Sequence, residues 1–222
     1  MAKVIVGMTT SLDGFVADPN GSATRLYPDL EALRGTDYMN ALIEATGAVV
    51  MGRKTFEMAG ADSYVGNYEF QVPIFVLTHH PPDVEPKQDE HLTFTFVSGG
   101  VQSAIDQARA AAGDKAVQVV GGVEVIRQLL RAGLVDELHV DVMPVLLGSG
   151  LRLLEGSDLE HVRLAREARR AGEWGENQPH LPRRELAAIR HCGGPPTSTP
   201  CHPTSWPSTA RRRGREPSRR RR

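Results

Sequence analysis

The sequence predicts an α/β protein whose mixed, mostly parallel sheet is flanked by helices. Three observations carry this prediction. Short apolar, β-branched runs alternate along the chain with segments of helical period. Two of these runs end in glycine directly before a helical segment, and turn-forming residues separate most of the others. Strands that alternate with helices favour a parallel sheet with helices on its faces.

The first strand is expected over residues 3–9, because KVIVGMT is a β-branched run. The segment 26–34 fits either a short helix or a loop. Apolar residues at helical spacing then predict a helix from Tyr38 that ends at Gly47. The apolar run over 48–51 predicts the second strand.

The middle of the chain continues this alternation. A short helix is expected over 54–59, and apolar runs predict strands over 73–77 and 93–97. The alanine-rich, amphipathic segment 101–112 predicts a helix. The buried-type run 117–120 predicts the next strand.

A helix and a strand complete the expected sheet. Apolar residues recur at helical spacing over 124–131, and Gly133 ends that helix. Strict alternation over 137–142 predicts a strand. The following PVLLGSG, residues 144–150, is either a loop that binds a substrate phosphate or a plain connection.

The segment AVVMGRKTFE, residues 48–57, has the composition of a phosphate site. A strand ends in the Gly52 turn, and the next helix begins with a basic pair and a threonine. The free N–H groups and the positive dipole end of a helix start favour an anion. Arg53 can bind two phosphate oxygens, Lys54 adds a charge and Thr55 adds a hydroxyl donor.

The segment AVQVVGGVEVIRQLLR, residues 116–131, contains a second strand-to-helix join. Gly121 and Gly122 lie at that join, where the absence of a Cβ lets main-chain N–H groups approach a ligand. Two such joins, one of them basic, suggest a dinucleotide. No predicted strand is followed by GxGxxG, the pattern of the common dinucleotide-binding fold.

These segments together resemble a known family. The matching motifs, in chain order, are SLDGFVAD (11–18), VVMGRKTFE (49–57), VLTHHP (76–81), VVGGVEV (119–125) and LVDELHVDVMPVLLGSG (134–150). They resemble the C-terminal reductase domain of the riboflavin-biosynthesis deaminase–reductase, within the dihydrofolate-reductase-like superfamily, over roughly residues 2–155. The resemblance implies an NADPH-dependent reductase, a small-molecule substrate of pyrimidine or pterin type, and a homodimer.

The resemblance also implies roles for particular residues. Arg53 and Thr55 would bind the 2′-phosphate, and Asp13, the expected catalytic residue, would lie nearest the substrate. The cofactor-binding set would comprise Gly52, Arg53, Lys54 and Thr55 at the adenosine-side phosphates, Thr78 and His79 at the ribose, and Gly121, Gly122, Val123 and Glu124 at the pyrophosphate. The substrate-binding set would comprise Met8, Asp13 and Gly14, with Leu147 and Gly148 from the later loop.

Two departures from the family pattern keep alternatives open. Val120 stands where riboflavin-pathway reductases carry a glutamate, and no H-x-E followed by P-C-x-x-C provides a zinc deaminase. A stand-alone reductase is therefore expected. The alternatives are a dihydrofolate or pterin reductase, for which Asp37 is either a proton-relay residue or a helix cap, and a non-catalytic nucleotide-binding or nucleic-acid-binding protein.

Length and composition predict one domain followed by a tail. The reductase-like domain is expected over 1–157, a strand or a helix over 158–171, and a disordered Arg/Pro-rich tail over 172–222. The closing strand pair of the family is expected to be missing. No apolar run could span a membrane and no signal-peptide pattern is present, which predicts a cytoplasmic protein.

Charge divides the chain at the same place. Residues 1–155 hold 11 Lys+Arg and 20 Asp+Glu, a balance of −9, whereas residues 156–222 hold 15 Arg and 7 acids, a balance of +8. The end of the tail, RRRGREPSRRRR, could bind nucleic acid, although we expect no such function. Besides histidine, arginine is the only basic residue in 156–222. Out-of-frame translation of GC-rich codons would also give this composition. Cys192 and Cys201 lack the spacing of a metal site, so no metal is expected.

Overall fold

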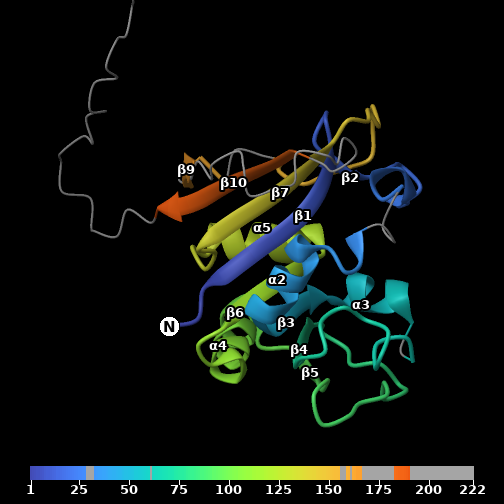
Figure 1. Ribbon diagram of the computed structural model, residues 1–222, viewed down its shortest axis with the longest axis vertical. Helices are drawn as coiled ribbons and strands as arrows, with labels where there is room; N and C mark the ends of the chain where they lie inside the picture. The colour runs from blue at the N-terminus through green and yellow to red at the C-terminus, as the bar shows by residue number, and fades with distance from the viewer. Residues whose placement is uncertain (29–32, 61, 156–158, 161, 167–182, 191–222) are drawn as a thin grey trace, which may run out of the picture. The chain divides into compact units, whose positions relative to one another are not determined.

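Six parallel strands form the centre of the structure (Figure 1). This computed structural model describes residues 1–28, 33–60, 62–155, 159–160, 162–166 and 183–190, of which residues 165, 166 and 183–190 are described as main chain alone. The compact unit to which all of these residues belong spans Met1–Cys192.

The larger sheet has the order β5-β4-β3-β6-β1-β7-β10-β9. Its strands are β1 (Val4–Ser11), β3 (Thr46–Gly52), β4 (Ile74–Leu77), β5 (Phe94–Val97), β6 (Ala116–Gly121), β7 (Glu137–Met143), β9 (Arg163–Arg166) and β10 (Arg183–Arg190). The helices are η1 (Thr24–Leu26), α2 (Asp37–Ala45), α3 (Arg53–Ala59), α4 (Gly100–Ala112) and α5 (Val123–Arg131). The predicted mostly parallel sheet is confirmed, with each of the six expected strands in place.

A second, small sheet pairs β2 (Phe15–Ala17) with β8 (Leu151–Arg152). The sequence analysis did not predict either strand, because each has three residues or fewer and neither alternates. Their pairing brings the turn after β1 beside the loop that follows β7. The short helix η1 ends at Leu26, the first residue of the segment 26–34, and residues 29–32 lie outside the described part of the chain.

The expectation that the closing strand pair is missing is wrong. β10 runs antiparallel to β7, with Arg183 opposite Val142, and β9 pairs with β10. The segment 158–171 therefore contributes a strand, and a further strand lies inside the expected disordered tail. Antiparallel pairing uses main-chain groups, so it forms here in a segment without the β-branched alternation that predicts strands. The remainder of that tail, with both cysteines, lies outside the described residues.

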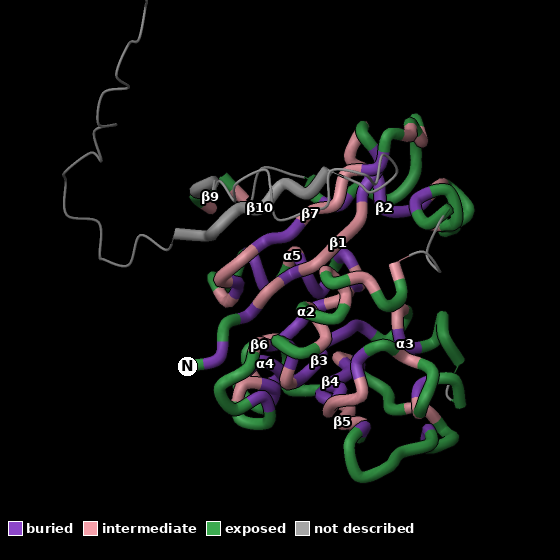
Figure 2. The backbone as a smooth tube through the Cα atoms, viewed as in Figure 1, coloured by how far each residue is buried: buried purple, intermediate pink, exposed green. Residues whose placement is uncertain are grey.

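Side chains of the central strands alternate between two apolar layers. On β3, Ala48 and Val50 face the layer formed with α4 and α5, and Val49 and Met51 face the other layer. Figure 2 shows these strands buried along most of their length. Burial on both faces explains why β3 and β6 are almost continuously apolar. The sheet is therefore a rigid base for the loops at its carboxyl edge.

The second layer is an aromatic cluster that anchors the segment after α3. Tyr64 is 1% exposed, and its hydroxyl donates to the Phe56 carbonyl at 2.9 Å. Its ring stacks on Phe56 at 5.5 Å and meets the edge of Phe94 at 5.2 Å. Burial, with the charge of Glu69, raises the pKa of Tyr64 to about 12. Residues 62–72 are thus held by packing, although they form no helix or strand.

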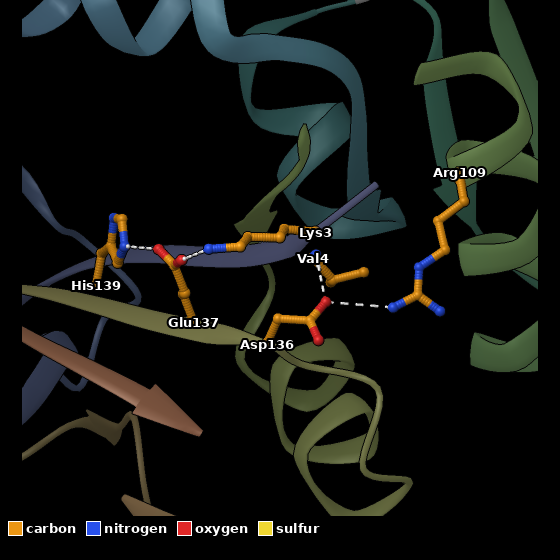
Figure 3. A network of polar contacts seen from close by, with 6 residues as sticks. All are labelled: Lys3, Val4, Arg109, Asp136, Glu137 and His139. Carbon is orange, nitrogen blue, oxygen red and sulfur yellow. Dashed lines mark hydrogen bonds and ion pairs between the residues drawn. The ribbon is translucent and has the colours of Figure 1, made fainter. Parts of the chain in front are cut away.

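Polar contacts fasten the start of β1 to β7 (Figure 3). Lys3 Nζ lies 2.7 Å from Glu137 Oε1, and His139 Nε2 lies 3.0 Å from Glu137 Oε2. Burial raises the pKa of Glu137, but hydrogen bonds from Lys3 and His139 outweigh it, so the pKa lies below its ordinary value. Beside them, Asp136 Oδ2 accepts from the Val4 N–H at 2.8 Å and from Arg109 Nη2 at 3.3 Å.

Replacing Asp136 should weaken the fold without touching the site. Asp136→Ala leaves the buried Val4 N–H without its acceptor, which costs roughly 1–3 kcal/mol of unfolding free energy. Asp136→Asn keeps an amide oxygen for Val4 and should lose much less. Urea unfolding measures both variants against Asp106→Ala, a control at an exposed position on α4. Equal losses for the alanine and asparagine variants would contradict this account.

Candidate functional site

The two glycine joins meet at the carboxyl edge of the sheet. β3 and β6 are neighbours, with Met51 opposite Gly121, so the turns that follow them lie side by side. A Cβ added to Gly52 would lie 3.3 Å from the Gly122 nitrogen and 3.0 Å from Val125 Cγ2. The main chains of the two joins are therefore in close contact, as the sequence analysis required of a single ligand site.

Thr55, in the first turn of α3, lies over the second join. A Cβ on Gly121 would be 3.1 Å from Thr55 Oγ1, and one on Gly122 would be 3.6 Å from it. Gly121 has φ +135°, a conformation that side chains rarely adopt, and its peptide bond to Gly122 is cis. Glycine is thus required at this position both by its own main chain and by the neighbouring helix.

Both helices that leave the joins begin without a side-chain cap. The N-cap of α3 is Gly52 and that of α5 is Gly122, so no side-chain oxygen accepts from the first-turn N–H groups. Arg53 and Lys54 are exposed beside them. Arg53 Nε lies 2.5 Å from Glu57 Oε1, and both side chains are about half exposed. A cation and uncapped N–H groups together suit a phosphate.

The predicted ribose residues follow the neighbouring strand. β4 pairs with β3 so that Leu77 lies opposite Gly52, which places Thr78 and His79 beside the first join. The Thr78 hydroxyl donates to the His80 carbonyl at 2.7 Å and accepts from the His80 N–H at 3.1 Å. The Thr78 side chain is therefore used in a local turn, whereas His79 is exposed.

The side chains of Val123 and Glu124 do not turn toward the joins. Val123 is buried in the core against α4 and the sheet. Glu124 Oε1 lies 3.3 Å from Arg131 Nη1 along the same helix, and its side chain is 62% exposed. Residues 121–124 therefore offer main-chain atoms, rather than side chains, to a ligand at the joins.

Asp13 joins the turn after β1 to the loop after β7. Its carboxylate accepts from Ser11 Oγ at 2.6 Å, from the Leu147 N–H at 3.1 Å and from the Gly148 N–H at 2.7 Å. The Ser11 hydrogen bond is the main cause that lowers the pKa of Asp13 to about 2; slight burial opposes it and the two N–H groups add to it. Because this pKa is depressed, the stabilisation is complete above about pH 4 and is lost as the pH falls toward 2.

Four of the predicted substrate residues, Asp13, Gly14, Leu147 and Gly148, therefore lie together in one rim, and Met8 lies earlier on β1. The N–H groups of Leu147 and Gly148, considered for a substrate phosphate, already bond to Asp13. Arg152 Nη1 donates to the Asp13 carbonyl at 3.1 Å, and its guanidinium lies 4.2 Å from the Phe15 ring centre. Gly14 has φ +84° in this turn, and Met8 packs partly against the core. Arg152 lies outside every motif quoted from the sequence, and Ser11 lies in SLDGFVAD but was given no role there.

Of the two interpretations of Asp37, the helix cap is wrong and the proton relay stays a prediction. The cap of α2 is Thr36, whose Oγ1 accepts from the Met39 N–H at 3.3 Å. Asp37 is instead an acid in the first turn of α2, where its negative charge interacts favourably with the helix dipole. A threonine directly before an aspartate leaves the cap position ambiguous in the sequence, since both residue types cap helices.

A second carboxyl at this end of the sheet was not singled out from the sequence. Asp141 lies on β7 opposite Thr9 of β1, and burial raises the pKa of Asp141 to about 6. Burial also raises the pKa of Tyr27; a hydrogen bond with the Thr9 side chain opposes that rise and the charge of Asp141 adds to it. An aspartate in an alternating strand gives no sequence signal of its burial.

Neither a metal-binding cluster nor a membrane-spanning helix occurs among the described residues. No three histidine, cysteine, aspartate or glutamate side chains among them lie close enough to hold a metal ion. None of the helices in this part of the chain is both long and apolar enough to cross a bilayer.

Comparison with known proteins agrees with this geometry. The chain is 28% identical over 151 residues to the uncharacterised protein YwjB of Bacillus subtilis, covering 68% of this chain and 82% of that protein. It is similar to the crystal structure of a candidate riboflavin biosynthesis protein from Shewanella sp. PV-4, at 25% identity and a TM-score of 0.64, over 86% of this chain and 100% of that one.

A more distant structure establishes the fold class. Dihydrofolate reductase from Enterococcus faecalis, solved with NADP(H), aligns with a TM-score of 0.51 at 17% identity, over 85% of this chain and 97% of that one. The predicted dihydrofolate-reductase-like fold is confirmed. The model of the family named RibD C-terminal domain matches residues 2–173, so this chain belongs to that family.

Proposed function

We propose that this chain is an NADPH-dependent reductase acting on a small heterocyclic substrate of pyrimidine type. The observation that carries the proposal is the meeting of the two glycine joins, at Gly52 and Gly121, at one edge of the sheet. Family membership and the NADP(H) complex of the Enterococcus enzyme support a reductase with this coenzyme.

The residues at the edge fit a phosphorylated coenzyme. A Cβ at either join would fill the space beside Thr55 or Gly122, so the main chain there is open only because the residues are glycine. Gly52, Arg53, Lys54 and Thr55 would hold the adenosine-side phosphates and Thr78 and His79 the ribose, while Gly121, Gly122, Val123 and Glu124 would hold the pyrophosphate through main-chain groups. The bound coenzyme supplies a hydride, and the protein supplies orientation and electrostatics.

Asp13 would position the substrate rather than exchange protons with it. A carboxylate whose pKa is about 2 stays ionised at neutral pH and accepts hydrogen bonds only. It fixes the Leu147–Gly148 loop against the turn after β1 and leaves Gly14 at the rim, with Met8 earlier on β1. The substrate would lie between these two segments, with its reducible C=N or carbonyl carbon toward the joins.

A pterin is the second candidate substrate. Val120 stands where the riboflavin-pathway reductases carry an acid that suits the pyrimidine, and the Enterococcus neighbour is named a dihydrofolate reductase. NADPH oxidation with aminouracil ribosyl phosphates and with dihydropterins separates the two. Turnover of only the first class supports the proposal, and NADPH binding without turnover of either class favours a non-catalytic nucleotide-binding protein.

Arg53→Ala should distinguish the coenzyme. Loss of one bidentate contact to a 2′-phosphate is expected to raise the Kd for NADPH roughly 10-fold and to change that for NADH little. Fluorescence titration with both coenzymes measures this, and Arg131→Ala on α5 is the control for loss of one exposed positive charge. An equal loss for NADPH and NADH would remove Arg53 from the 2′-phosphate.

A further inference from the structure

Arg127, in the middle of α5, directs its side chain to a distant part of the chain. Its Nη2 donates to the Arg152 carbonyl at 2.8 Å, and its Nε donates to the Leu153 carbonyl at 3.2 Å. Glu155 Oε2 lies 3.6 Å from Nη2, and the Arg127 side chain is only 14% exposed. These contacts join α5 to the segment 151–155, which follows the loop after β7.

The segment 151–155 also contacts the turn that carries Asp13. The Leu153 N–H donates to the Gly14 carbonyl at 3.1 Å, and Arg152 Nη1 donates to the Asp13 carbonyl at 3.1 Å. β8, at the start of this segment, pairs with β2, which follows the turn. A continuous series of hydrogen bonds therefore leads from the guanidinium of Arg127 to the substrate rim.

The two ends of this series differ in how firmly they are held. α5 begins after Gly122 of the second join, and its side chains Val123, Val125, Ile126, Leu129 and Leu130 are buried. In the segment 151–155, by contrast, Leu153 is the one buried side chain, and regular structure is limited to the two residues of β8. A segment held by so few groups opens locally when one of them is removed.

We propose that Arg127 is a positioning residue for the substrate. It holds the segment 151–155, and through it the turn of Asp13 and Gly14, at a fixed place relative to the coenzyme helix α5. The inference rests on the proposed reductase function. Nε and Nη2 of a planar guanidinium can donate to two successive carbonyls, which the single ammonium of a lysine does not match.

Arg127→Ala tests the assignment by separating KM from kcat. The KM for the substrate should rise about tenfold, with kcat changed less than about twofold, because the rim shifts and binding weakens. The Kd for NADPH should stay as in the wild type, since both joins are intact. Arg131→Ala is the matched control, because this arginine of the same helix pairs with Glu124 of α5. A wild-type KM for Arg127→Ala, or an equal rise for the control, would overturn the assignment.

Arg127→Lys shows whether charge or geometry matters. Lysine keeps a positive charge beside Glu155, whose side chain is 65% exposed, but it loses the paired bonds to the two carbonyls. This variant should fold and should recover only part of the loss in KM. Full recovery would mean that the ion pair, rather than the two carbonyl bonds, positions the rim.

A double variant tests whether Arg127 acts through the turn of Asp13. If both residues position the same turn, adding Arg127→Ala to Asp13→Asn should lower kcat/KM by less than about twofold further. A purely stabilising role would leave the two losses additive. An additive, tenfold further loss would therefore contradict the proposed route.

Hydrogen exchange gives a measurement that needs no turnover. The Leu153 N–H should exchange about tenfold faster in both Arg127 variants, while the amides of β6 keep their wild-type rates. Unchanged exchange at Leu153 would overturn the inference. A wild type that neither binds NADPH nor reduces a substrate would instead overturn the proposed function, whatever the exchange rates are.

Discussion

Gly121→Ala is expected to raise the Kd for NADPH by about 100-fold, equivalent to roughly 2.7 kcal/mol. The new methyl group would lie 3.1 Å from Thr55 Oγ1, in the space between the two joins. It would also hold a side chain at φ +135°, which costs roughly 1–3 kcal/mol of folding stability. Fluorescence titration with NADPH and urea unfolding measure the two effects separately.

Gly113→Ala is the matched control for backbone strain. Gly113 also has a positive φ, +61°, but no atom lies within 4 Å of its added Cβ, and it lies before β6 rather than after it. This variant should lose some stability and keep its affinity for NADPH. Equal affinity losses for the two variants would mean that Gly121 acts only through folding.

Asp13→Asn is expected to lower kcat/KM roughly 10- to 100-fold, because substrate positioning is lost while coenzyme binding is kept. An asparagine side chain has one acceptor oxygen, so its NH₂ group would face the N–H of either Leu147 or Gly148. The loop after β7 would then detach from the turn after β1. Steady-state kinetics at neutral pH, beside an NADPH titration, measures the change.

Asp18→Asn provides the comparison for this variant. Asp18 also accepts from two main-chain N–H groups, but these belong to Asn20 and Ser22 of its own turn and not to the Leu147–Gly148 segment. It should keep wild-type kcat/KM. A wild-type rate for Asp13→Asn would show that the hydrogen bonds of Asp13 do not position the substrate.

The central sheet was predictable because its strands are buried on both faces. Continuous apolar runs such as AVVM at 48–51 mark β3 and its neighbours, and glycine marks the point where each of two strands turns into a helix. The elements that were missed are short or polar. β2 and β8 form strands by pairing with one another, and β10 forms a strand by pairing with β7. No property of any one of these segments alone therefore predicts a strand.

The candidate site likewise contains some residues that local sequence predicts and others that it does not. The glycines and basic residues of the two joins carry a local signal, since their chemistry and their position in the chain coincide. The hydrogen bonds of Asp13 to Leu147 and Gly148 span sequence separations of 134 and 135 positions. No local sequence pattern predicts a contact over such a separation. The burial of Asp141 likewise depends on which segment covers β7. Long-range contacts therefore explain what the sequence analysis left out.

The pairing of β10 with β7 also covers a strand edge that main-chain hydrogen bonds could otherwise join to another molecule. Every residue assigned here to the coenzyme or the substrate lies between positions 8 and 148, before β9 and β10 begin. β10 pairs with the main-chain groups on the outer side of β7. Without β10, those groups would be a template for pairing with another molecule. β10 thus covers one side of β7, and the residues proposed to bind the coenzyme and the substrate all precede it in the chain.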